Sequence, residues 1–280
     1  MPDNDNKTDY TLIIEGGRKN HNYWKDLWHY RELFFFLSWR DILVRYKQTV
    51  IGIAWSVIRP LLTMIIFTIV FEKLAKLPSN GVPYPIMVYC ALLPWQFFSN
   101  AVTESSNSLI SNSNLLSKVY FPRLIIPVSS IIVGLIDFFI SFLILCLLMI
   151  VYLFMPTWKI FTLPLFLIIP VIASLGCGFW FSALTVNYRD FRYVVPFIIQ
   201  LGLYISPVGF SSAIVPENWK LLYSLNPMAG VIDGFRWAIL GDKTEIYLPG
   251  FILSVLFSIL LFITGLWYFR KMEKSFTDVI

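Results

Sequence analysis

Charged residues are scarce in this chain of 280 residues. They make up 14% of it, against about one quarter in an ordinary soluble domain, whereas 57% of the residues are hydrophobic and the mean hydropathy is +0.69. This composition excludes a soluble globular domain and indicates an integral membrane protein. In such a protein the formal charge of +5 reports orientation in the membrane, so we expect no nucleic-acid partner.

Residues that bind metals or form disulfides are also few. The three cysteines, Cys90, Cys146 and Cys177, lie within apolar runs and lack the spacing of a zinc site. The two histidines, His21 and His29, have no HExxH motif around them. We read the cysteines as small packing residues and predict neither a metal nor a cofactor.

Three further signals are missing. No GxxxxGK[ST] segment is present, so we predict that the chain itself does not hydrolyse ATP. No Ser, His and carboxylate arrangement and no carboxylate pair stands out, which gives no support to an enzyme. The first fifty residues lack the apolar run and cleavage site of a signal peptide, so we expect the N-terminus to stay on the side where it is made.

Six apolar stretches approach or reach the length of about 20 residues that a helix needs to cross a bilayer. These predicted spans are Ile53 to Phe71, Val82 to Phe98, Leu124 to Met155, Ile160 to Val186, Tyr193 to Phe210 and Leu248 to Phe269. The third is long enough to project beyond the bilayer or to break at Pro127. We therefore predict an all-α integral membrane protein, with a polar segment at residues 1–29 and a six-span transmembrane domain at residues 30–280.

Lysine and arginine are distributed unequally around these spans. Fifteen lie on the side that carries the N-terminus and six on the other side. Short cytoplasmic loops collect these residues. Because an even number of spans places both termini on one side, we predict that both termini are cytoplasmic.

The segment before the first span has the pattern of an amphipathic helix. Its apolar residues share one face at 100° per residue: Phe35, Phe36, Trp39, Ile42, Leu43 and Tyr46. Its polar residues share the opposite face: Arg31, Ser38, Asp41, Arg45 and Gln48. This predicts a helix in the membrane interface that turns at Gly52 into the first span. The helix either fixes the tilt of that span or frames an entrance for a lipid with an anionic head.

Arg59 and Pro60 interrupt the first apolar stretch. Arg59 can extend back to the cytoplasmic surface, and the missing donor of Pro60 is tolerable near the first turns of a helix. With Arg45 and Lys47, Arg59 forms the nearest group of cations to the entrance. We predict that these three bind a lipid head group, with arginine best suited to phosphate oxygens.

Two loops carry further helical patterns. From Asn100 to Arg123, apolar residues recur at helical spacing in a polar stretch: Leu109, Ile110, Leu115 and Leu116. This predicts a short cytoplasmic helix whose apolar ridge docks into another protein or packs on its own bundle. From Ser211 to Tyr247, two apolar pieces flank Asn226 and Pro227, and each is too short to span. They are either half-helices that dip into the outer leaflet around a cavity or helices lying flat in the interface.

Asp137 is the one acid deep in a predicted span. Since a charge there is costly, it either accepts a hydrogen bond from a neighbouring helix or lines a polar path. Aromatic residues make up 18% of the chain. We consider Trp95, Trp180 and Tyr204 as candidates for lining the same path, with lipid-facing positions as the alternative.

Several stretches together resemble the permease subunits of polysaccharide-export ABC transporters, the type-2 exporters of O-antigen, capsule or teichoic acid. They are RYKQTVIGIAWSVIRPLLTMIIFTIVF from Arg45, LLPWQFF from Leu92, SKVYFPRLIIPVSS from Ser117, YRDFRYVVPF from Tyr188, ISPVGF from Ile205 and NPMAGVIDGFRWAIL from Asn226. The resemblance covers the chain from about residue 30 onward. One small departure is Ile51, where leucine is expected before Gly52.

The resemblance implies a homodimer of six-span subunits that forms one channel in the inner membrane, above two copies of a separate ATPase subunit. It implies export of an undecaprenyl pyrophosphate-linked polysaccharide. The ATPase-docking helix corresponds to Ser106 to Lys118, with Leu109, Asn112, Leu115 and Leu116 as contacts. The outer gate helices correspond to Pro216 to Leu240, with these candidate gate residues: Pro216, Trp219, Asn226, Pro227 and Arg236. The alternatives are a membrane-bound enzyme acting on lipid-linked sugars and a type-2 permease for drugs or lipids.

Overall fold

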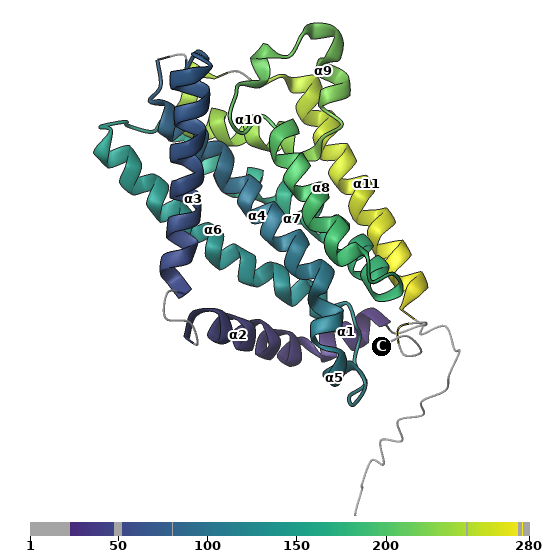
Figure 1. Cartoon of the computed structure of the whole chain (residues 1–280). Helices are drawn as coiled ribbons and strands as arrows, with labels where there is room; N and C mark the ends of the chain where they lie inside the picture. Colours follow the sequence, from purple (N-terminus) through teal and green to yellow (C-terminus); the bar gives the residue numbers. More distant parts are fainter. Residues whose placement is uncertain (1–22, 48–51, 80, 245, 274–275, 277–280) are drawn as a thin grey trace, which may run out of the picture.

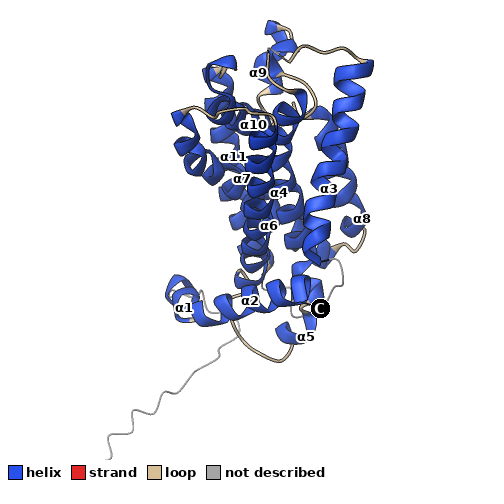
Figure 2. Cartoon of the chain, turned by 90° about the vertical axis from the view of Figure 1, so that its left-hand side faces the viewer, coloured by secondary structure: helices blue, strands red, loops and turns tan. Residues whose placement is uncertain are grey.

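The computed structural model describes residues 23–47, 52–79, 81–244, 246–273 and 276. These residues are mainly helical, and none of them forms a β-strand (Figures 1 and 2). The polar segment up to residue 22, which includes His21, lies outside the described residues, as do Gln48 and Ile51. The predicted all-α class is confirmed.

Six helices run along the long direction of the bundle (Figure 1). They are α3 (Gly52–Phe67, continued by the π-helical η1, Thr68–Leu74), α4 (Tyr84–Ser111), α6 (Ile125–Val151), α7 (Leu163–Asn187, preceded by the 3-10 helix η2, Trp158–Thr162), α8 (Phe191–Ile205) and α11 (Leu248–Met272). Five of these stretches are long and apolar enough to cross a membrane. The chain is therefore a multi-pass membrane protein.

The fifth predicted span is shorter than expected. α8 has 15 residues, which is about 22 Å of helix against about 30 Å of hydrocarbon. It ends at Ile205 because Ser206, which precedes Pro207, is extended, and a residue before proline disfavours the helical conformation. Tyr193 to Phe210 thus does not form one continuous spanning helix.

Of the two alternatives for the third span, projection beyond the bilayer or a break at Pro127, the structure excludes the break. α6 is continuous from Ile125 to Val151, so Pro127 is its third residue. The backbone N–H groups of a first helical turn have no intrahelical partner, and a proline there removes nothing. The helix is about 40 Å long, which exceeds the hydrocarbon thickness.

The short helix predicted between the second and third spans is mostly a continuation of α4, which ends only at Ser111. No glycine or proline interrupts the chain from Phe98 to Ser111. The polar side chains there bond to carbonyls of their own helix, as Thr103 does to Ser99 and Ser108 to Ser105. Their hydrogen bonds are thus met without ending the helix. After Asn112 a single turn follows, α5 (Ser113–Leu116).

Two helices lie across one end of the bundle, which we call the base (Figure 1). They are α1 (Tyr23–His29) and α2 (Arg31–Lys47), and α5 lies beside them. The apolar face of α2 is turned outward, with Phe35 71% and Trp39 53% exposed, whereas Leu37 and Ser38 are buried. This amphipathic helix was predicted from the sequence, and it packs on the bundle through the face that carries Leu37 and Ser38.

The opposite end holds the segment between α8 and α11. It forms η3 (Ser212–Ile214), α9 (Glu217–Tyr223), α10 (Pro227–Leu240) and η4 (Gly241–Lys243). α9 lies on the surface with no buried residue, whereas eleven of the fourteen residues of α10 are buried. α10 packs against α4, α7 and α11. The two apolar pieces, treated alike in the sequence analysis, thus differ in position.

α4 is the central helix of the bundle. It is the most buried of the long helices and packs on α6, α7 and α10. A second apolar cluster near the base joins α1 and α2 to the lower ends of α6, α7 and α11. α7 and α11 approach closely at Gly176, where a Cβ atom would lie 2.6 Å from the backbone of Leu261. This packing leaves a gap between α3, α4, α6 and α8, which forms the site described next.

Candidate functional site

A cavity of about 1030 Å³ lies between α3, α4, α6 and α8. Its charged lining residues are Arg45, Arg59, Glu104 and Asp137, and its uncharged polar ones include Gln96, Asn100 and Gln200. Aromatic and aliphatic side chains also line it, among them Trp55, Trp95 and Leu92. A polar cavity inside an apolar bundle is a candidate path for a polar molecule, because charges within spans are costly and face such cavities.

Asp137 of α6 is the centre of the polar contacts at this cavity. Its Oδ2 lies 3.2 Å from Nη1 of Arg45 on α2. Its Oδ1 accepts a hydrogen bond from the hydroxyl of Tyr46 on α2 and another, of 3.1 Å, from Oγ of Ser56 on α3. The carboxylate thus joins the helix at the base, the first spanning helix and α6. Asp137 thus bonds to neighbouring helices and also lines the cavity.

The three cations of the predicted head-group site are not equivalent. Arg45 is paired with Asp137 and lies 3.5 Å from Glu104. Arg59 lines the cavity, and no carboxylate of the described residues lies within ion-pair distance of its guanidinium. Lys47 is exposed at the end of α2 and does not line the cavity. Arg59 is therefore the cation of the three whose charge is available in the cavity.

Arg59 and Pro60 lie in the third turn of α3, deeper than the first turns expected. By the usual helical pattern the missing N–H of Pro60 leaves the carbonyl of Ser56 without its partner. The Pro60 side chain is buried, whereas the preceding residue, Arg59, is exposed. Both residues line the cavity.

The aromatic residues proposed for the path are separated by the fold. Trp95 lines the cavity and packs so closely on α8 that a Cβ at Gly202 would lie 2.8 Å from its ring. Trp180 stacks on Tyr268 of α11, with ring centroids 4.2 Å apart, and donates a hydrogen bond to Thr264. Tyr204 is 62% exposed near the end of α8. Of the three, only Trp95 lines this cavity.

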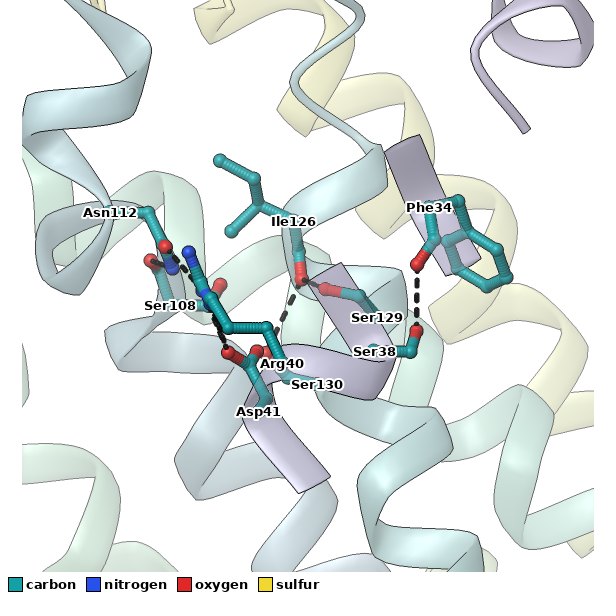
Figure 3. Close-up of polar contacts among 9 residues, drawn as sticks. All are labelled: Phe34, Ser38, Arg40, Asp41, Ser108, Asn112, Ile126, Ser129 and Ser130. Carbon is teal, nitrogen blue, oxygen red and sulfur yellow. Dashed lines mark hydrogen bonds and ion pairs between the residues drawn. The ribbon is translucent and has the colours of Figure 1, made fainter. Parts of the chain in front are cut away.

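At the base, α2 is bonded to the junction of α4 and α5 (Figure 3). Nη2 of Arg40 donates to Oδ1 of Asn112 over 2.8 Å, and the same guanidinium is held by Asp41. Asn112, which links α4 to α5, donates from Nδ2 to the carbonyl of Ser108. A movement of α5 would thus act directly on α2.

The apolar ridge predicted for protein docking is divided between two environments. Leu109 is fully buried in the apolar cluster near the base. Leu115 and Leu116 on α5 are half-buried and pack partly on the same cluster. Only these two leucines of the ridge present surface at the base.

The described ends of the chain meet at the base. The hydroxyl of Tyr23 on α1 donates to Oε1 of Glu273, which directly follows α11, over 3.1 Å. Glu273 also accepts from the backbone N–H of Arg123, just before α6. Burial raises the pKa of the Glu273 carboxyl. α1, the entry to α6 and the end of α11 therefore form one unit.

The residues proposed for an outer gate have mainly structural contacts. Arg236 of α10 is 3% exposed and donates to the carbonyls of Met87, Val208 and Phe210. Asn226 caps α10, since its Oδ1 accepts from the N–H of Met228 and Pro227 is the first helical residue. Pro216 precedes α9, on which Trp219 is 60% exposed. These contacts hold α10 against α4 and the α8–α9 connection.

Tyr46, Ser56 and Glu104 were missed by the sequence analysis as members of the site. Helical periodicity placed Tyr46 with Phe35 and Trp39 on the apolar face, yet its hydroxyl bonds to Asp137. At the end of a helix an amphipathic tyrosine can direct its ring and its hydroxyl to different environments. No signal in the sequence pairs residues that lie 91 positions apart.

Comparison with known proteins adds evidence from sequence. Residues 32–240 match the family model of the ABC-2 type transporter. The chain is 28% identical over 256 residues to the O-antigen export system permease protein RfbA of Klebsiella pneumoniae, a match that covers 89% of this chain and 95% of that protein. The protein of the same name from Myxococcus xanthus is 27% identical, with coverage of 76% and 82%. The polysialic acid transport protein KpsM of Escherichia coli is 21% identical, with coverage of 84% and 92%.

Proposed function

Because this chain belongs to the ABC-2 type transporter family, we propose that it is the channel-forming permease subunit of an exporter of lipid-linked polysaccharide. The observation that carries this proposal is the cavity within the apolar bundle, whose wall includes charged and polar side chains, among them Arg59, which has no ion-pair partner among the described residues. The named relatives export O-antigen or transport polysialic acid. A separate ATPase supplies the energy, and the chain resides in the inner membrane.

A second copy of the chain would complete the channel. On either side of the cavity, α3 and α8 expose apolar side chains, such as Leu62 and Ile66 on α3 and Phe197 and Leu201 on α8. Lipid can cover such faces, but a homodimer that joins α3 of one copy to α8 of the other would enclose the cavity from the lipid. Two ATPase copies below the base match this symmetry.

The head of the lipid carrier would enter beside α2 and meet Arg59. A pyrophosphate cannot cross hydrocarbon without partners, and a guanidinium binds phosphate oxygens through two parallel hydrogen bonds. Arg45 has a different task here, because Asp137 and Glu104 already oppose its charge. It holds α2 at the entrance while Arg59 receives the head.

We expect Arg59→Gln to reduce polymer export severely and Arg59→Lys to reduce it measurably. Lysine keeps the charge but lacks the planar pair of donors. The measurement is the amount of polymer reaching the cell surface at matched expression. Lys47→Gln serves as the control, since Lys47 lies outside the cavity lining, and its export should be near wild type. Wild-type export by Arg59→Gln would refute head-group recognition.

The proposed orientation in the membrane follows from the distribution of cations and from an even number of membrane crossings. The base carries the excess of cations, and α8, with the chain beyond it, would complete a sixth crossing and bring α11 back to the base (Figure 1). We therefore place α2, α5 and both termini in the cytoplasm. α9 and α10 then form the outer gate, with α10 entering the outer leaflet.

A cysteine-labelling experiment tests this orientation. In a variant without Cys90, Cys146 and Cys177, we expect a cysteine at Asn218 on α9 to react from outside with a membrane-impermeant thiol reagent. One at Asn114 on α5, which is equally exposed to solvent in the structure, should react only after the membrane is opened. Asn80, in the connection between the first two predicted spans, lies outside the described residues. External labelling at Asn114 would reverse the orientation.

A further inference from the structure

A second cavity, of about 450 Å³, lies at the end of the bundle opposite the base. Its walls come from α10, the start of α11 and the connection that runs from α8 through η3 to α9. None of its lining residues lines the larger cavity. Its volume falls in the range of about 300 to 1000 Å³ that small-molecule sites occupy.

Asp233 of α10 is the acidic residue of this wall. The residues on either side of it, Ile232 and Gly234, are buried in the bundle, but Asp233 keeps part of its surface open to the cavity. No cation of the described residues lies within ion-pair distance of its carboxylate. Arg236, one turn further along α10, attracts this carboxylate electrostatically. Its guanidinium, however, donates its hydrogen bonds to three backbone carbonyls.

The hydroxyl of Ser212 supplies Asp233 with one hydrogen bond. An ionised carboxylate has about four acceptor positions, so most of its capacity is unused by the described residues. A carboxylate withdrawn from bulk water needs donors in compensation. The site therefore suits a ligand that carries several hydrogen-bond donors.

The rest of the wall offers complementary groups. Nζ of Lys220 lies 3.8 Å from the exposed carboxylate of Glu217, a weak surface pair that leaves ammonium donors to share. The hydroxyl oxygen of Thr244 is buried and has no hydrogen-bond partner among the described residues. Two aromatic rings, Tyr223 and Tyr247, supply apolar surface beside these polar groups.

The occupant best matched to this set is a sugar. A pyranose ring presents hydroxyls that both donate and accept, together with apolar C–H faces that pack on aromatic rings. Asp233 disfavours a phosphate, and two of the cations on this wall are engaged: Arg236 donates to three backbone carbonyls and Lys243 to the carbonyl of Gly81. A metal ion would meet a single carboxylate among the described residues, and no group of three metal-binding side chains occurs there. A lipid tail would leave the polar wall without partners.

We propose that this cavity is a carbohydrate subsite that binds one sugar unit, with Asp233 accepting hydrogen bonds from its hydroxyls and Lys220 donating to them. The proposal rests on the proposed export function, in which α9 and α10 lie where the polymer leaves. A weak site at that position would bind the emerging polymer between one transport step and the next. Each new sugar unit could then replace the last.

Binding of free sugars to the purified chain tests the subsite. The chain is placed in lipid nanodiscs, because maltoside detergents carry a sugar head group of their own. The probes are the methyl glycosides of glucose, galactose, mannose and rhamnose, each measured by saturation-transfer NMR at millimolar concentration. We expect transfer to at least one of them, and a loss of affinity of about tenfold in Asp233→Asn, because a hydrogen bond to a charged acceptor is stronger than one to a neutral acceptor.

Asp190→Asn is the matched control, because it removes an exposed carboxylate at the other end of the bundle. Asparagine is nearly isosteric with Asp233 and can keep the bond from Ser212, so we expect an unchanged unfolding temperature. The proposal is overturned if wild-type chain shows transfer to none of the glycosides, or if Asp233→Asn binds as wild type does. Neither ATPase nor export is needed for this test. A failure of the proposed function would be seen separately, as absent polymer export by wild-type chain together with its ATPase.

Discussion

Asp137→Ala should be the most destabilising single substitution in the polar cluster, lowering the free energy of unfolding by about 2 to 3 kcal/mol. It removes the shared acceptor of Arg45, Tyr46 and Ser56 and leaves a cation and two hydroxyls without their partner. If the Arg45–Asp137 pair were completely buried, we would expect a larger loss of unfolding free energy. The side chain of Arg45 is 31% exposed, so water recovers part of its solvation.

Unfolding of the purified chain by SDS in mixed micelles, followed by tryptophan fluorescence, measures this loss. Glu104→Ala is the matched control, because Glu104 pairs with the same Arg45 at 3.5 Å but is 54% exposed. It should cost under about 1 kcal/mol. Arg45→Ala in the Asp137→Ala background should cost little more than Asp137→Ala alone, because the pair is already broken. Equal effects of Asp137→Ala and Glu104→Ala would show that Asp137 does not hold the helices together.

Asp137→Ala should also reduce export beyond its effect on folding. Without this carboxylate, α2 loses its polar bonds to α6 beside the cavity, and Arg45 loses the closer of the two carboxylates that oppose its charge. We expect polymer export per folded chain to fall several-fold. Export that follows the amount of folded chain alone would limit Asp137 to a structural role.

The double substitution Leu115→Asp and Leu116→Asp should abolish recovery of the ATPase subunit with the permease. Burying one leucine stabilises a complex by about 2 kcal/mol, and two carboxylates in the same contact add a desolvation cost. The affinity should therefore fall on the order of a hundredfold or more. The measurement is the amount of ATPase that co-purifies with a tagged permease at matched permease yield.

Leu153→Asp provides the control, since Leu153 is 87% exposed at the opposite end of α6, and it should leave the complex intact. Both leucines of α5 also pack partly on their own bundle. If that packing were their whole role, the double variant would lower permease yield while the remaining folded chain still bound the ATPase. Unchanged ATPase recovery per folded permease would thus refute docking at α5.

Local signals in the sequence were enough to predict much of the fold. Apolar runs of about 20 residues or more predicted the five long helices, because a backbone in hydrocarbon must satisfy its own hydrogen bonds. Helical periodicity predicted α2 and placed Trp39 on one face with Phe35, and both side chains are exposed. Asn226 and Pro227 marked the start of α10, since a cap and a first-turn proline act within one turn of chain.

The partners of the functional side chains were decided only by tertiary packing. Arg40 and Asn112 are 72 positions apart, and Tyr46 and Asp137 are 91 apart. Periodicity reports which face of a helix a residue occupies but not which neighbour covers that face. The same limit applies to Leu109, whose spacing left docking and packing on its own bundle open and which is buried, and to Trp180, which stacks on Tyr268. It applies also to Arg59: the packing of α2 on α6 pairs Asp137 with Arg45, and no carboxylate of the described residues forms an ion pair with Arg59.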